Sequence, residues 1–229
     1  MSSAFYKDKL VRMTDTIRKV VSQKIEEFER DYLTTGKPMD IVKEMGELHM
    51  RIILVSAFGL TNLNHVRLPY ESKGVTKHYS IDQYLRKLTS FMLFRAGRPI
   101  FAIIPYLMFF YYSSEDREYT RNIKCIRNFC ESIIEERKKS LKEDREKHIN
   151  NPDLLTILLS DDMFKDNNKS MIDEIITFFL AGSFTLRSTN SNMFMYLAMY
   201  PEVHRNLMKE LITTHLADFV DKKEPIDTE

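Results

Sequence analysis

The sequence predicts an all-α protein, and three observations support that fold class. Apolar residues recur at the three- and four-residue spacing of a helix along most of the chain. The 229 residues include seven prolines and only six glycines, which leaves little room for the many turns of an all-β architecture. No stretch shows the strict alternation of a half-buried strand convincingly. We therefore expect a single helical domain over residues 1–229.

Seven helices are expected from the apolar spacing and from the residues that start and stop helices. The turn "TTGKP" ends the first helix, Asp40 is placed to cap the second, and Pro201 opens the last. Ser170 is the expected cap of the central helix. The approximate ranges are 5–31, 40–58, 81–96, 115–142, 152–160, 171–200 and 201–216. The stretch "TNLNHVRLPYESKGVTKHY", residues 61–79, lacks periodicity and is expected to form a loop.

Charge and hydropathy argue against several classes of partner. The formal net charge is +1, without the basic stripe that nucleic-acid binding requires, so no nucleic-acid partner is predicted. The start, "MSSAFYKDKL", has charged residues where a signal peptide has its apolar core. The most apolar stretch, residues 99–112, is shorter than the roughly 20 residues of a spanning helix and is split by Pro105. Buried packing is the preferred interpretation there, and a membrane-surface patch is the alternative.

The usual metal and nucleophile patterns are not found. The six histidines include no pair at a spacing of three or four residues, so no metal site is predicted. His49 lies near a buried helix face and is expected to be a core or boundary residue. Cys125 and Cys130 are about 140° apart on one helix and cannot bridge each other, so both are expected to be free thiols. Cys130 belongs to the buried stripe of that helix.

The stretch "FFLAGSFTLRSTNS", residues 178–191, interrupts an apolar helix with a glycine, which costs about 1 kcal/mol relative to alanine. Helical spacing places five residues on one face: Phe178, Ala181, Gly182, Thr185 and Thr189. A flat group could lie against Ala181 and Gly182, with the Thr185 hydroxyl beside it. A close crossing of two helices explains the small residues as well, and the residues alone favour that explanation.

The same stretch resembles the central oxygen-binding helix of the cytochrome P-450 family, whose pattern Ala/Gly-Gly-x-Asp/Glu-Thr-Thr/Ser is similar to "AGSFTL". Its neighbours are similar in the same order. "PDLLTILLS" looks like the Asp-Leu-Leu helix of that family, and "MYLAMYPEVHRNLMKEL" looks like its Leu-Ala-x-x-Pro-Glu run. "IIEERKKS" and "IVKEMGELHMRIILVSAFGL" resemble the preceding helices. The series covers nearly all 229 residues and implies the central helical portion of a partial cytochrome P-450 fold.

The resemblance also implies a function. Relatives of this kind bind haem b, take electrons from a reductase and use dioxygen to oxidise an apolar small-molecule substrate. By the same resemblance, Ala181 and Gly182 lie against the haem, and Thr185 organises proton delivery to dioxygen. Phe178 and Phe184 are expected in the substrate pocket. The implied location is the endoplasmic reticulum membrane or the cytoplasm, with membrane association possible in the complete protein.

Three departures from the family pattern qualify that implication. Phe184 stands where the family has an acid, and general acid–base steps contribute about 10²–10⁴-fold. Leu186 replaces the second hydroxyl, and Arg187 is expected to form an ion pair or to lie at the surface. The family's Glu-x-x-Arg pair and haem-ligating cysteine loop lie downstream of the matched helices, and Cys125 and Cys130 lack the surroundings of that loop. The alternatives are a non-catalytic helical binding protein on the same scaffold, or an incomplete gene model.

Overall fold

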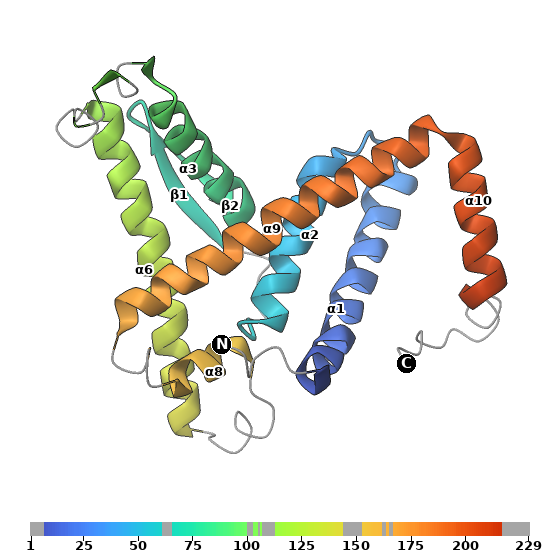
Figure 1. Ribbon diagram of the computed structural model, residues 1–229, viewed down its shortest axis with the longest axis horizontal. Helices are drawn as coiled ribbons and strands as arrows, with labels where there is room; N and C mark the ends of the chain where they lie inside the picture. Colours follow the sequence, from blue (N-terminus) through green and yellow to red (C-terminus); the bar gives the residue numbers. More distant parts are fainter. Residues whose placement is uncertain are drawn as a thin grey trace.

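The computed structural model describes residues 7–60, 66–99, 103–104, 106, 113–143, 153–161, 164 and 167–216. Within those ranges the protein is mostly helical, as predicted. The elements in chain order are α1 (Lys7–Phe28), η2 (Glu29–Leu33), α2 (Ile41–Ser56), β1 (Arg67–Ser72), β2 (Val75–Ser80), α3 (Ile81–Ala96), α6 (Ser114–Glu143), α8 (Leu154–Ser160), α9 (Asn168–Met199), α10 (Pro201–Leu211) and η3 (Ile212–Leu216). The elements η2 and η3 are short π-helices. The long helix α9 runs diagonally across the molecule, and α10 folds back from its end (Figure 1).

Side chains cap the starts of the helices in the way that their sequences indicate. The Asp40 carboxylate accepts a hydrogen bond from the Lys43 amide at 3.0 Å, and Asp153 does the same for the Thr156 amide of α8 at 2.9 Å. The expected cap of the central helix was wrong. Asn167, not Ser170, caps α9, because its side-chain oxygen accepts the Ser170 amide and the helix starts at Asn168.

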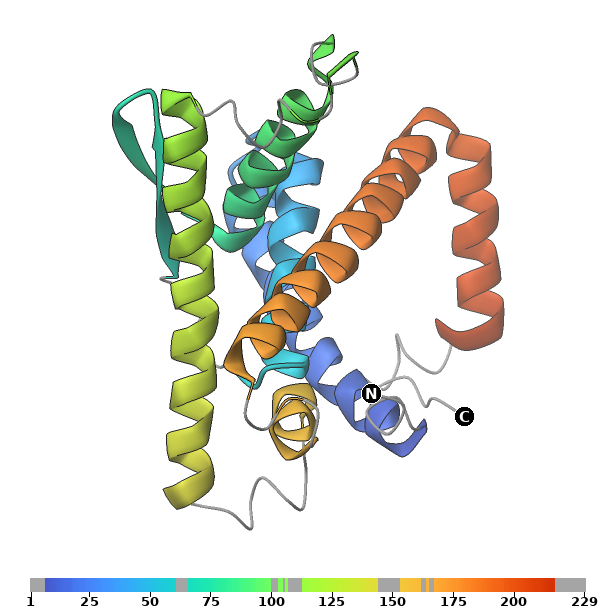
Figure 2. The same ribbon diagram turned by 60° about the vertical axis from the view of Figure 1, so that its left-hand side comes forward.

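A β-hairpin replaces part of the predicted loop. β1 and β2 pair in antiparallel register from Arg67 opposite Ser80 to Ser72 opposite Val75. The turn between them has positive φ at Lys73 (51°) and Gly74 (73°), as hairpin turns that match the strand twist require. The hairpin lies along α6 (Figure 2), whose Asn122 side chain bonds both the amide and the carbonyl of Glu71. The loop prediction failed because this pairing depends on a helix about 50 residues away.

The core lies where α9 crosses α2 and where α6 meets the hairpin and α8. Its members are fully buried apolar side chains, among them Phe58, Tyr84, Ile126, Ile134, Leu155, Met171, Ile175 and Phe179. Phe58 and Phe179 meet edge to face with ring centroids 5.3 Å apart, which joins the end of α2 to α9. Burying these side chains stabilises the α2–α9 crossing, with roughly 1.5–3 kcal/mol from each large side chain.

Both cysteines are free thiols, as predicted. Cys130 is completely buried in the core, and burial raises the pKa of its thiol to about 12. Most of the apolar stretch 99–112 lies outside the described residues. Among the helices that the structure describes, none is long and apolar enough to cross a membrane.

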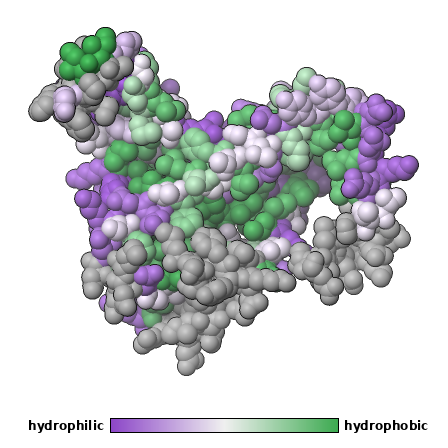
Figure 3. Space-filling model, viewed as in Figure 1, coloured by the Kyte–Doolittle hydropathy of each residue, from purple (hydrophilic) through white to green (hydrophobic). Residues whose placement is uncertain are grey.

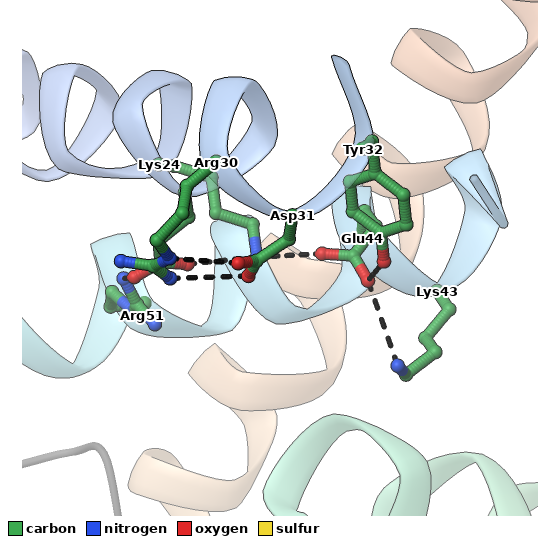
Figure 4. Close-up of polar contacts among 8 residues, drawn as sticks. Lys24, Arg30, Asp31, Tyr32, Lys43, Glu44 and Arg51 are labelled. Carbon is green, nitrogen blue, oxygen red and sulfur yellow. Dashed lines mark hydrogen bonds and ion pairs between the residues drawn. The ribbon is translucent and has the colours of Figure 1, made fainter. Parts of the chain in front are cut away.

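A buried polar cluster joins α1 to α2 (Figure 4). The Lys24 ammonium lies 2.6 Å from a carboxylate oxygen of Glu44, and both side chains are about 5–6% exposed. The Tyr32 hydroxyl donates to the other Glu44 oxygen at 2.7 Å. Burial alone would raise the pKa of the Glu44 carboxyl, but its bonds to Lys24 and Tyr32 outweigh that effect and hold the pKa below 4.5. The carboxylate is therefore charged at neutral pH and ties the two helices together.

Candidate functional site

The helix α9 is regular through the stretch that the sequence singled out. Residues 168–199 form one continuous α-helix. The Thr185 hydroxyl donates to the Ala181 carbonyl, four residues earlier, at 2.7 Å. Hydroxyl groups in helix interiors commonly make this bond. The helical turn from Ala181 to Thr185 is therefore intact, and the Thr185 hydroxyl donates its hydrogen bond to the backbone.

Two faces of α9 have different environments. Ser183, Arg187 and Ser191, at four-residue spacing, are buried together with Phe179 one turn earlier. The opposite side carries exposed residues, which we call the open face: Ala181, Thr185, Ser188 and Thr189. Figure 1 shows α9 passing in front of α2, and Figure 3 shows hydrophobic residues gathered along the middle of that side of the molecule. The open face is accessible in the described part of the chain.

Gly182 lies at the edge of the open face, beside Ile53 of α2. A Cβ atom at Gly182 would lie 2.7 Å from the Cδ1 atom of Ile53 in α2. The glycine therefore leaves room for the end of the Ile53 side chain where α2 and α9 cross, in line with the packing explanation that the residues alone favoured. Ala181 and Thr185 remain the part of the predicted cofactor face that a second group can reach.

Replacing Gly182 with valine is expected to lower the free energy of unfolding by about 1–3 kcal/mol, because the added carbons overpack the contact with Ile53. Chemical denaturation of the purified chain measures this change. Combining it with Ile53→Ala makes room for the valine, so the double variant is expected to lose less than the sum of the two single losses. Strict additivity would contradict the assigned contact.

The two phenylalanines predicted for a substrate pocket are half-buried. Both pack against the edge of the core. The Phe184 ring also faces the guanidinium of Arg187, with 4.5 Å between the Arg187 Cζ atom and the ring centroid. This is a cation–π contact. The residue that replaces the family's acid is therefore engaged with a positive charge on its own helix.

Arg187 forms the ion pair that the sequence allowed, and the pair is buried. Its Nη1 atom donates to an Asp82 carboxylate oxygen at 2.9 Å, and the Ser183 hydroxyl donates to the same oxygen at 3.0 Å. Asp82 is 1% exposed and lies in the first turn of α3, where helix N-termini favour negative charge. Asp82 was not predicted as a site residue, because its partners on α9 lie more than 100 residues away in the sequence. An acid two residues after the Ser80 cap was the only local signal.

His49 is a core residue, as expected. Its Nδ1 atom lies 2.7 Å from the Met45 carbonyl oxygen, and its Nε2 atom lies 3.0 Å from the side-chain nitrogen of Asn190 in α9. Burial lowers the pKa of His49 below 6.5, so its ring is neutral at pH 7. The residues that the structure describes contain no group of three or more metal-ligating side chains that could hold an ion.

A cavity of about 410 Å³ lies away from the open face, between the end of α1, η2, α2, β1 and the start of α3. Its lining includes charged side chains, among them Glu27, Glu47, Arg51 and Arg67. Apolar ligands prefer cavities with mostly hydrophobic walls. This cavity is therefore a poor match for an apolar substrate.

Comparison with known proteins assigns the scaffold. A family model described as cytochrome P450 matches residues 1–221. The chain belongs to the cytochrome P450 family. It is 28% identical to cytochrome P450 3A14 of Cavia porcellus over 189 residues, which are 78% of this chain and 34% of that protein. It is 26% identical to cytochrome P450 3A17 of the same species over 223 residues, 93% of this chain and 41% of that protein.

This cytochrome P450 chain thus spans between a third and a little over two-fifths of the relatives it matches. Membership in this family implies haem as the cofactor. The open face offers a small side chain at Ala181 and a hydroxyl at Thr185, which suit the approach of a flat ring. Haem in this family also needs a cysteine thiolate on its iron.

Neither cysteine of this cytochrome P450 chain meets that need. Cys130 is fully buried in α6, and its raised pKa keeps it protonated at neutral pH. Cys125 is half-buried on the same helix. Both cysteines lie on α6, whereas Ala181 and Thr185 lie on the exposed side of α9. The described residues therefore fit one wall of a haem site and do not fit its axial ligand.

Proposed function

We propose that this chain is the central helical portion of a cytochrome P450 monooxygenase, in which the open face of α9 forms one wall of the haem site. Family membership supports the reaction class. The observation that carries the assignment of the wall is the exposure of Ala181 and Thr185 on a helix whose other side is buried at Phe179, Ser183, Arg187 and Ser191. In the complete protein, haem supplies the iron at which dioxygen is reduced with electrons from a reductase, for oxidation of an apolar small molecule.

The roles proposed for this chain's own residues follow from their contacts. Ala181 provides the low surface on which a flat ring can rest. Thr185 holds its proton on the Ala181 carbonyl and can release it only by breaking that bond. Phe184 adds an apolar edge beside Thr185 in place of an acid, and it packs on Arg187. Attachment to the endoplasmic reticulum membrane stays a prediction for the complete protein.

A second candidate is a non-catalytic helical binding protein that keeps the P450 scaffold. Phe184 in place of an acid favours it, because within the described residues the Thr185 hydroxyl bonds only to the backbone of its own helix. The two candidates differ in one measurable property. A wall of a haem site requires that haem approach Ala181, whereas a scaffold that binds elsewhere does not.

Haem titration of the purified chain tests the proposal. Haem is expected to bind without a thiolate-type spectrum of the reduced carbon monoxide complex, because neither cysteine supplies the ligand. Ala181→Phe is expected to weaken binding about tenfold by covering the wall. Leu186→Phe is the matched control, since Leu186 is exposed on α9 outside the open face.

Equal haem affinity of Ala181→Phe and Leu186→Phe would contradict the wall assignment and favour the non-catalytic candidate. A thiolate-type spectrum from residues 1–229 alone would overturn the conclusion that the axial ligand is absent from the described residues.

A further inference from the structure

The buried side of α9 contains an ionic cluster that the family assignment does not explain. Asp82 of α3 receives two bonds from α9, one from Ser183 and one from Arg187. Its second carboxylate oxygen lies 3.1 Å from the Nε atom of Arg86 on its own helix. A buried ion pair is costly to desolvate and adds little net stability compared with apolar packing. Such a cluster is better understood through the geometry that it imposes.

The geometry concerns the rotation of α9 about its own axis. Ser183 and Arg187 are one turn apart, and both bond the same Asp82 oxygen. Turning α9 by one residue would move both donors by about 100° and leave that buried Asp82 oxygen without its two donors, with Arg86 beside the other oxygen. Apolar contacts tolerate such a change far better, since they have no direction. The bonds to Asp82 therefore select one rotation among the several that the mainly apolar surface of α9 would allow.

Phe184 and Gly46 restrict the same arrangement from two further sides. The Phe184 ring lies on the guanidinium of Arg187 and limits its movement. Gly46 of α2 faces the cluster so closely that a Cβ atom there would lie 2.5 Å from an Asp82 oxygen and 3.0 Å from the Cδ atom of Arg187. Residues from α2, α3 and α9 thus enclose one carboxylate and one guanidinium.

We infer that Asp82, Ser183, Arg187 and Phe184 form a unit that sets the rotation of α9, with Arg187 as its positioning residue. This rotation places Ala181 and Thr185 on the open face and Ser191 inside. Arg187 and Phe184 act together, because the Phe184 ring packs against the guanidinium that bonds Asp82 and fixes the rotation of α9. The inference rests on the proposed function only in treating the open face as functional, and its structural content is independent of haem.

Thiol labelling of reporter cysteines on the two sides of α9 tests the inference. Ala181→Cys reports on the open face, and Ser191→Cys reports on the buried face with little change in size. Peptide-resolved mass spectrometry after maleimide treatment separates both reporters from Cys125 and Cys130. In the otherwise unchanged chain, the Ala181→Cys reporter is expected to react much faster than the Ser191→Cys reporter.

Arg187→Met is expected to raise the reactivity of the Ser191→Cys reporter relative to the Ala181→Cys reporter about tenfold, because α9 loses its preferred rotation. Arg187→Lys keeps the charge and is expected to restore part of the difference. Asp82→Asn serves as a milder variant if Arg187→Met does not fold. Leu155→Ala is the control, since it removes buried apolar contacts in α8 and leaves the cluster intact.

An equal change of the reactivity ratio in Leu155→Ala and Arg187→Met would show that Arg187 contributes stability alone, and the inference would be overturned. So would an unchanged ratio in both Arg187→Met and Asp82→Asn. Because no haem is present in the assay, failure of the haem titration leaves this result unaffected, and the reverse also holds.

Discussion

Replacing Lys24 with methionine is expected to lower the free energy of unfolding by about 3–5 kcal/mol, among the largest losses we predict for a single substitution in this chain. Lys24 and Glu44 are both buried, and their charged atoms lie 2.6 Å apart. Methionine fills the space of the lysine stem but leaves the Glu44 carboxylate buried without its main counter-charge. The cost comes from that poorly compensated charge more than from the lost attraction, since the exposed Lys43, 3.6 Å from the other Glu44 oxygen, offsets it only weakly. Urea denaturation followed by circular dichroism measures it.

The double variant Lys24→Met/Glu44→Gln separates the two contributions. Glutamine is neutral and can still accept the hydrogen bond of the Tyr32 hydroxyl. The double variant is therefore expected to be more stable than Lys24→Met, although it contains one more substitution. If the double variant is instead less stable than Lys24→Met by the full cost of replacing Glu44, the buried charge is not the source of the stability lost in Lys24→Met.

The pH dependence of stability tests the same pair. The pKa of Glu44 is below 4.5 in the folded chain because Lys24 and Tyr32 outweigh the effect of burial. A carboxyl group with a lowered folded pKa stabilises the fold fully above its unfolded pKa and loses this contribution as the pH falls through the folded value. The unchanged chain should therefore lose stability below about pH 4.5. In Lys24→Met, the effect of burial on the Glu44 pKa is no longer outweighed by Lys24. The loss of stability at acidic pH that comes from Glu44 should therefore diminish or reverse.

Gly46→Ala is expected to lower the free energy of unfolding by about 3 kcal/mol, although alanine favours helices by roughly 1 kcal/mol over glycine. The added methyl group would lie 2.5 Å from the Asp82 oxygen beside Arg86, and moving this carboxylate would disturb the bonds of its other oxygen to Ser183 and Arg187. Gly182→Ala is the matched comparison. Its added methyl group meets only the end of the flexible Ile53 side chain, so the loss there should be much smaller.

Asp82→Ala identifies the origin of the Gly46→Ala loss. In that background the colliding carboxylate is absent, and adding Gly46→Ala is expected to cost clearly less than it does in the unchanged chain. Equal stability of Gly46→Ala and Gly182→Ala would mean that the Asp82 cluster yields easily, contrary to the rigid arrangement described above.

Helix positions were predictable because their signals are local, although the start of α9 was not, since Asn167 caps it instead of Ser170. Apolar residues at helical spacing, and caps such as Asp40, act within one or two turns of the chain. The hairpin was not predictable in the same way. Its register depends on Asn122 of α6, and only the inward side chains of β1, such as Leu68, carry an apolar signal. A two-stranded hairpin alone is marginally stable, so its sequence need not show a strong strand pattern.

The candidate site shows the same division. The sequence identified the small residues and the hydroxyl of the central helix, and it allowed Arg187 an ion pair. It could not show that Gly182 serves the crossing with Ile53 while Ala181 faces outward, because both residues lie within one turn. Nor could it supply Asp82, whose chemistry is ordinary until the fold brings it to Ser183 and Arg187.

By itself, the sequence determined the helical class, the approximate helix ranges and the membership of the cytochrome P450 family. These properties follow from patterns between near neighbours in the chain or from the order of short motifs. Only the tertiary structure decided which side of α9 is open and which partner holds Arg187. The physical reason is that the rotation of a largely apolar helix is weakly specified by its own residues and is selected by directional bonds to distant ones.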